Sequence, residues 1–244
     1  MKYSDIATGI VTALILSACG MVVAGDEPDS PADEPLTHSA RYYPLTIGNE
    51  YYYKAVKARA PNREYRVKAE IKKLQTVDGK DYFYLFAPSV GVRYLIRRDE
   101  TGMFMRLLKR EIPLFGISLN VHLIPELLFL RFPLTVGDQW SQQVVAKARI
   151  LFIPVRRTIE ARYHVVDRQV LHTEAGDIDV FVVNANLGVV GGSMVNKTFW
   201  YGENIGYVKA DAPEDFLVIV GYRVFDEQTG IWIDKRPFDA ERYK

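Results

Sequence analysis

The chain has 244 residues, a mass of 27.9 kDa and a formal net charge of +1 from 31 basic and 30 acidic residues. This balance argues against a dedicated nucleic-acid binder, whose surface is strongly basic. The single cysteine argues against disulfide frameworks and cysteine-rich metal centres. Apolar residues make up 48% and the mean hydropathy is −0.06, values typical of a globular protein rather than a disordered or polytopic membrane chain.

The N-terminus has the layout of a signal peptide. Lys2 precedes an apolar stretch of 11 residues, 6–16, and Ser17 and Ala18 then lead to Cys19. The sequence LSAC at residues 16–19 resembles the lipobox of bacterial lipoproteins, which implies cleavage before Cys19 and attachment of a lipid to its thiol. Two other readings stay open: an uncleaved membrane anchor, because residues 6–25 carry no charge over about the length that spans a bilayer, and a secreted protein with an unmodified cysteine.

An acidic, proline-rich segment follows the cysteine. Residues 26–35 hold five acids and three prolines, so they cannot bury apolar surface and should stay extended as a tether. We therefore expect a signal peptide at 1–18, a lipidated Cys19 and tether at 19–40, and a globular domain at 41–244. The expected location is the bacterial cell envelope, and Gly20 after the cysteine resembles a signal for the outer membrane, on its periplasmic or surface face.

Beyond the tether the dominant period is two, as expected for strands with one buried face. Residues 64–71 and 159–165 alternate without a fault. The sequence therefore predicts a mainly β protein of about ten strands, built as a large curved antiparallel sheet, half-barrel or sandwich with few short helices. Further strands are expected at 50–57, 81–86, 90–97, 144–150, 178–183, 197–201 and 215–225.

Helical signals are few. Residues 125–131 (PELLFLR) are the best candidate for a short helix, because proline suits its first position and Glu126 its first turn. Residues 103–110 fit a strand or a short helix equally well.

One motif occurs twice. YPLTIGNEY at residues 43–51 recurs 89 residues later as FPLTVGDQW at 132–140, with four identities in nine positions. A duplicated ligand loop and a duplicated structural turn are both compatible with this echo. Turn chemistry accounts for every position, so we favour a turn that starts an equivalent strand in two similar halves.

The first copy carries a family resemblance. YPLTIGNEYYY at 43–53 resembles the FPLxxGNxWxY opening of secreted and lipid-anchored β-rich bacterial envelope proteins, and residues 174–180 and 200–209 resemble later turn-and-strand hallmarks of that family. The resemblance implies a β-rich envelope domain related in shape to the half-barrels of Lol-type lipoprotein carriers. It implies no activity.

Candidate chemistry is sparse. His164, Asp167 and His172 could approach one another across a turn as a metal or hydrolytic site, although an exposed strand histidine is the commoner case. No nucleophile elbow or phosphate-binding glycine loop occurs, so we expect no catalytic residues, metal or cofactor. A surface hydrolase with a site assembled from dispersed residues stays open as the alternative function.

Residues 112–134 form the most apolar part of the body, and three prolines interrupt them. Leu119, Leu123, Leu127 and Leu128 are the candidate lining of an apolar ligand pocket, with a solid core as the plainer reading. Residues 54–110 carry 15 basic and 6 acidic residues, which fits either an anionic membrane surface or a solvated sheet face. The leading expectation is a non-enzymatic protein, anchored in the membrane by its N-terminal lipid, that binds an apolar ligand such as a lipid or an envelope protein partner, but not nucleic acid.

Overall fold

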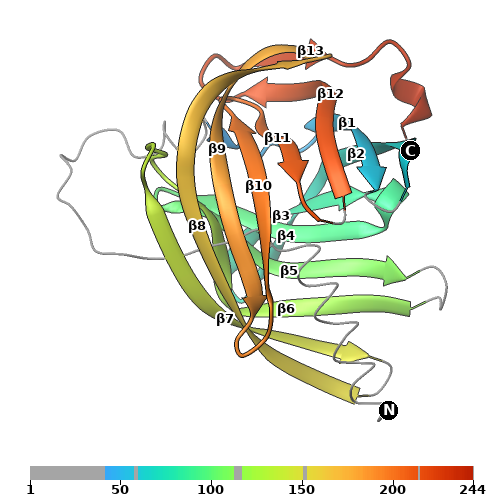
Figure 1. The fold of residues 1–244 in the computed structure, drawn as a ribbon. Coiled ribbons are helices and arrows are strands. Elements are labelled where there is room, and N and C mark those ends of the chain that lie inside the picture. The colour runs from blue at the N-terminus through green and yellow to red at the C-terminus, as the bar shows by residue number, and fades with distance from the viewer. Residues whose placement is uncertain (1–41, 58–59, 113–116, 151–152, 214, 244) are drawn as a thin grey trace.

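The computed structural model describes residues 42–243 except 58–59, 113–116, 151–152 and 214 (Figure 1). The expected signal peptide, Cys19 and tether therefore lie outside the described residues. Within the described part of the chain, no helix has the length and apolar character needed to cross a bilayer.

The described chain forms one antiparallel sheet in which thirteen strands follow one another in chain order. Strand β1 pairs with both β2 and β12, so the first twelve strands close into a barrel, and β13 continues outward from β12. The prediction of a mainly β protein is confirmed. Where a curved sheet, half-barrel or sandwich was predicted, the sheet closes into a complete barrel. Closure gives each of these twelve strands a neighbour on both sides, which removes the exposed edges of an open sheet.

The first six strands are β1 (Glu50–Lys57), β2 (Ala60–Val77), β3 (Lys80–Ala87), β4 (Val92–Asp99), β5 (Gly102–Ile112) and β6 (Ile117–Arg131). The others are β7 (Gln139–Ile150), β8 (Ile153–Thr173), β9 (Gly176–Val189), β10 (Met194–Gly202), β11 (Gly206–Asp211), β12 (Asp215–Asp226) and β13 (Ile231–Lys235). Two 3₁₀ turns, η1 (Pro88–Val90) and η3 (Ala240–Arg242), complete the described elements.

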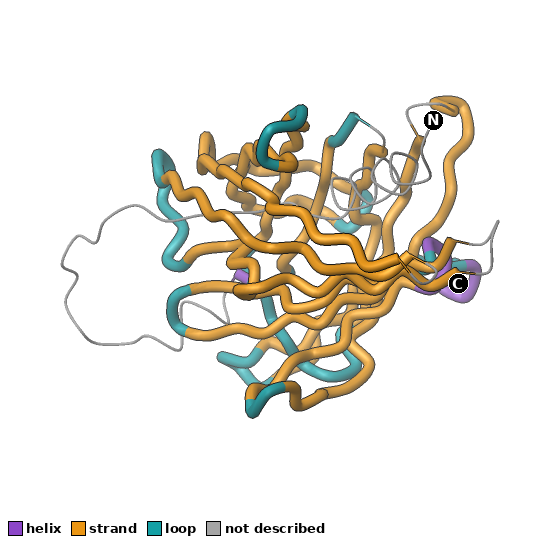
Figure 2. The backbone as a smooth tube through the Cα atoms, turned by 90° about the horizontal axis from the view of Figure 1, so that it is seen from below, coloured by secondary structure: helices purple, strands orange, loops and turns teal. Residues whose placement is uncertain are grey.

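The long strands β7–β10 curve round one side of the barrel, and β3–β6 cross the other side (Figure 1). Seen at right angles, the connecting loops gather at the two ends of the strands (Figure 2). We call the end where the chain enters β1 and β7, beside the two Pro-Leu-Thr turns, the motif end. The opposite end, which carries the β1–β2, β3–β4, β5–β6, β7–β8 and β9–β10 connections, is the far end.

The two Pro-Leu-Thr turns adopt the same structure. In the first, the N–H of Asn49 donates to the carbonyl of Thr46 at 3.1 Å, and the N–H of Gly48 donates to the carbonyl of Ile71 at 2.9 Å. In the second, Asp138 donates to Thr135 at 3.1 Å and Gly137 donates to Val165 at 2.8 Å. The two glycines have φ of 93° and 100°, a left-handed conformation that favours glycine.

The likeness extends into the strands that follow. The turns lead into β1 and β7, and the next strands, β2 and β8, each carry a bulge directly after Ile71 and Val165. Burial also corresponds, since Leu45 and Leu134 are 3% and 5% exposed whereas Ile47 and Val136 are 51% and 50% exposed. These matches agree with a duplicated structural turn that starts equivalent six-strand halves, β1–β6 and β7–β12.

The helix expected at 125–131 is wrong, because these residues lie in β6. Met103, Phe104 and Met105 of β5 pair with residues of this segment, and the apolar run therefore packs as a wall of the barrel. Sheet pairing overrides the local helical signals of a proline and a glutamate. Residues 103–110, ambiguous in sequence, belong to β5.

Pro125 interrupts the pairing of β6 with β7. The β6–β7 ladder covers only Val121 to Ile124 and stops at the proline, which has no N–H to donate. Beyond it the side chain of Gln142 spans the two strands, accepting from the N–H of Leu128 and donating to the carbonyl of Glu126, both at 3.2 Å. We call this stretch the β6–β7 seam.

The main cluster of buried hydrophobic residues lies between residues 42 and 224 of the described chain. The C-terminal segment packs outside the barrel, where Tyr243 contacts Tyr52 and Val220. Closure and core thus both lie after residue 41, so this part of the chain contains what it needs to fold by itself.

Candidate ligand-binding interior

The motif end of the barrel is closed by aromatic side chains. Tyr43 meets Phe129 edge to face, with ring centroids 6.0 Å apart, and Tyr42 contacts Phe132 and Phe181 at 6.0 and 5.5 Å. All five residues are buried. The two Pro-Leu-Thr segments and their aromatic neighbours therefore act as a plug.

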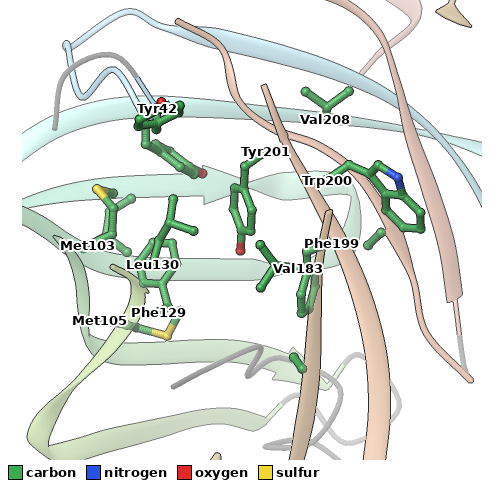
Figure 3. Packing of buried hydrophobic residues seen from close by; sticks show 14 of the residues in the cluster. Tyr42, Met103, Met105, Phe129, Leu130, Val183, Phe199, Trp200, Tyr201 and Val208 are labelled. Carbon is green, nitrogen blue, oxygen red and sulfur yellow. The ribbon is translucent and has the colours of Figure 1, made fainter. Parts of the chain in front are cut away.

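Opposite walls meet inside the barrel near its motif end. Figure 3 shows Tyr201 of β10 directed between Leu130 of β6 and Val183 of β9, while the neighbouring Trp200 points the other way. Lys209 lies over the Trp200 ring at 4.0 Å. Alternate residues of β10 thus separate an apolar interior from an amphipathic outer surface.

The interior is less tightly covered toward the far end. Cross-strand partners share a face of the sheet, so the partners of buried core residues identify further inward positions. Tyr94 pairs with buried Leu108, Ala148 with Val155, and Val195 with Leu187. Tyr94, Ala148 and Val195 are nonetheless only half-buried, which shows that solvent reaches apolar interior surface at this end.

The four predicted leucines divide between two environments. Leu119, Leu123 and Leu127 are 1%, 0% and 0% exposed and lie in the core along β6. Leu128 is half-buried and pairs with Phe104, whose ring lies under the Arg97 guanidinium at 3.9 Å. Three leucines thus form part of the inner wall, and their role in ligand binding stays a prediction.

In the far-end halves of β5, β8 and β10, three cations occupy inward positions, and the sequence reading missed them. Arg110 pairs with Leu119, Arg157 with Ala146 and Lys197 with Ala185, and all three partners are buried core residues. Lys197 is itself only 6% exposed. The available signal was its place between Val195 and Phe199 in strict alternation, which puts the lysine on the apolar face.

The interior also holds tyrosine hydroxyls. Burial raises the pKa of Tyr43 and of Tyr201 far above the ordinary value, with the field of neighbouring tyrosines as a smaller cause. Both side chains are therefore neutral hydrogen-bonding groups at physiological pH.

A polar cluster lies on the outer surface beside the seam. The Arg97 guanidinium contacts the Glu126 carboxylate at 2.6 Å, and the Tyr82 hydroxyl donates to the same carboxylate. Burial alone would raise the pKa of Glu126, but the hydrogen bonds from Arg97 and Tyr82 outweigh it and lower that pKa. Burial and the bond to Glu126 raise the pKa of Tyr82 to about 12.

His164, Asp167 and His172 do not come together. All three lie along β8, where the eight positions between the two histidines correspond to about 26 Å of extended chain. His172 is exposed and contacts Asp177 at 2.7 Å, a hydrogen bond that raises its pKa. Nor do the histidine, cysteine, aspartate and glutamate residues within the described ranges form any cluster able to hold a metal ion.

No protein-family model matches this sequence, and no curated protein does. Similar solved structures include a presumed exported protein with a YmcC-like fold from Bacteroides fragilis, with a TM-score of 0.48, 11% identity, and coverage of 75% of this chain and 98% of that chain. A presumed lipoprotein from Parabacteroides distasonis has a TM-score of 0.42 and 12% identity, and the match covers 75% of this chain and 98% of that chain. The hypothetical lipoprotein YmcC from Escherichia coli has a TM-score of 0.43 and 8% identity, and the match covers 71% of this chain and 83% of that chain. All three likenesses have TM-scores below 0.5 and identities of 8–12%.

Proposed function

We propose that this chain is a lipid-anchored, non-enzymatic protein of the bacterial cell envelope whose barrel holds an apolar ligand that enters at the far end. The supporting observation is the asymmetry of the barrel, which is plugged by buried aromatic residues at the motif end and leaves inward apolar residues half-buried at the far end. Apolar interior surface reached by solvent is what an acyl chain would cover.

The proposed ligand is tested by its co-purification. A chain of residues 20–244, which begins after Cys19 and includes every described residue, is purified without detergent, and its organic extract is analysed by mass spectrometry. We expect acyl lipid in a stable ratio to protein. An extract without lipid, together with no uptake of a fluorescent fatty acid, would contradict an apolar ligand and favour a protein partner.

Two neighbouring positions of β7 provide matched variants. Ala148 faces inward and is half-buried, whereas Lys147 is exposed and lies in the outward alternation. Ala148→Trp places an indole in the far-end interior and should lower lipid retention severalfold, while Lys147→Trp should retain the parent amount. Equal retention by the two variants would exclude the far-end interior as the ligand site.

The anchor is tested at Cys19. The LSAC motif at residues 16–19 leads us to expect a mature N-terminus that begins at a triacylated Cys19. The protein should then incorporate labelled palmitate when cells are grown with it. Cys19→Ala should abolish labelling and release the protein from membranes. An intact Met1 terminus, or unchanged membrane association of Cys19→Ala, would contradict lipidation; fractionation of the two membranes then tests outer-membrane sorting.

A further inference from the structure

The inner wall is not purely apolar, because its far-end half carries nitrogen donors. In that half of β5, β8 and β10, the charged residues at inward positions are Arg110, Arg157 and Lys197. Each makes interactions with other groups of the protein. A ligand head group would therefore join or exchange with an existing polar environment rather than occupy an empty one.

Lys197 lies deepest among these cations. Its neighbours two residues away on the strand are Val195 and Phe199, and its cross-strand partner is Ala185. The aliphatic part of the Lys197 side chain therefore lies among apolar side chains. The small Ala185 leaves room over β9 for the lysine. An ammonium group at such a place is costly to desolvate and interacts strongly with any anion that approaches it.

A second donor lies on the same row of the sheet. Trp140 pairs with Tyr163, Tyr163 with Ala185, and Ala185 with Lys197, so the row crosses four strands on the inner face. The Trp140 indole stacks on Tyr163, with ring centroids 5.5 Å apart. Its Nε1 is buried and has no hydrogen-bond acceptor among the described residues. A buried indole N–H without an acceptor is uncommon and marks a place where an acceptor can bind.

We infer that the ligand is an anionic amphiphile, a single acyl chain with a carboxylate or phosphate head, and that Lys197 binds this head inside the barrel with Arg157 and Arg110 nearer the far end. This inference rests on the proposed apolar ligand and adds its charge. Cations with an indole N–H supply donors only, which suits the oxygen acceptors of carboxylate and phosphate alike.

The test compares head groups on one chain length. Binding of palmitate, 1-palmitoyl lysophosphatidylglycerol and the uncharged monopalmitoylglycerol to residues 20–244 is measured by calorimetry below their micelle-forming concentrations. We expect the anionic ligands, or one of them, to bind on the order of 10-fold or more tightly than the neutral one, as a charge-assisted hydrogen bond predicts. Preference for palmitate identifies a carboxylate head, and preference for the lysolipid identifies a phosphate head.

Variants then assign the effect to Lys197. Lys197→Met should lower anionic affinity to that of the neutral ligand while leaving neutral affinity unchanged, and Lys147→Met on the outer face should change neither. Arg157→Gln, at a half-buried position, repeats the comparison should Lys197→Met fail to fold. Equal affinity of the parent protein for anionic and neutral ligands, or an equal loss of both affinities in Lys197→Met, would overturn only the inference that the ligand has an anionic head group. If no acyl compound binds, the proposed function itself is overturned.

Discussion

Asn49 and Asp138 occupy equivalent places in the two halves but have different surroundings. The Asn49 side chain is fully buried, donates to the carbonyl of Pro44 at 3.0 Å and accepts from the N–H of Phe225 at 2.9 Å. Asp138 is half-buried and accepts from the N–H of Thr135 within its own turn at 3.1 Å. The first side chain thus links the turn to β12, whereas the second stabilises only the turn.

The two positions should differ in their contribution to stability. Asn49→Ala leaves the N–H of Phe225 without its acceptor and removes one of the two donors to the carbonyl of Pro44, which also accepts from the Tyr51 hydroxyl, so we expect a loss of about 2–3 kcal/mol in the free energy of unfolding. Asp138→Ala removes one exposed bond and should cost about 0.5–1 kcal/mol. Urea unfolding followed by circular dichroism measures both, and equal losses would contradict the bridging role of Asn49.

Glu126 should make the stability of the protein depend on pH in the acidic range. Its pKa is lowered in the folded protein, so its ionised form contributes stability that is fully present above the unfolded value of about 4.3 and is lost as the pH falls through the folded value. Glu126→Gln removes one of the two carboxylate partners of Arg97, the other being Asp99, and should cost about 1–3 kcal/mol at pH 7.

The difference between parent and Glu126→Gln should therefore narrow below about pH 4. Thermal unfolding at pH 7 and at acid pH measures this change, and Glu160→Gln at an exposed ion pair is the control, with an expected cost near zero. A difference that is constant with pH would show that ionisation of Glu126 does not contribute.

Among the elements, the β6–β7 seam departs from a regular ladder. Four residue pairs join the strands near the far end, and beyond Pro125 the Gln142 side chain replaces backbone pairing. The equivalent boundary between β12 and β1 is paired from Glu50 to Lys57. Beyond Pro125, the seam thus depends on the Gln142 side chain.

Gln142→Ala should open the seam locally. The N–H of Leu128 loses its acceptor, so we expect its amide hydrogen exchange to accelerate by about 10-fold or more while strands remote from the seam keep their protection. Gln143→Ala alters the exposed neighbour on the other face of β7 and should leave Leu128 unchanged. Unchanged exchange in Gln142→Ala would show that other contacts hold the seam.

At the scale of the molecule, closure joins the first strand to the twelfth. Residues 50–57 pair with 215–223, so neither six-strand half completes a barrel by itself. A separated half would expose two sheet edges and an open apolar face. The two halves should therefore unfold as one cooperative unit.

Two probes can test this cooperativity. Trp140, Trp200 and Trp232 all lie after residue 131, so tryptophan fluorescence reports unfolding of the second part of the chain. Amide hydrogen exchange of β2–β4 reports unfolding of the first half. We expect coincident urea midpoints for the two halves. Separate midpoints would contradict a single folding unit.

Several features were predictable because they are encoded by adjacent residues. Alternation at 64–71 and 159–165 predicts strands, and the repeated Pro-Leu-Thr-x-Gly pattern predicts equivalent turns, since both depend on local backbone geometry. The helix expected at 125–131 failed because its local signals are weak beside pairing with β5. Leu119, Leu123 and Leu127, chosen as pocket lining from the apolar composition of residues 112–134, are buried in the core, whereas Leu128 is half-buried, and their role in ligand binding stays a prediction.

The sequence by itself thus determined the β class, most strand positions, the duplicated turn and the expectation of an N-terminal lipid anchor. Only the tertiary structure decided that the sheet closes, because pairing of residues 50–57 with 215–223 depends on the number, twist and stagger of all the strands between them. Closure also decided which alternate face became the interior. Alternation with Val195 and Phe199 puts Lys197 on an apolar face, and closure of the barrel makes that face the inner wall, where the lysine is buried.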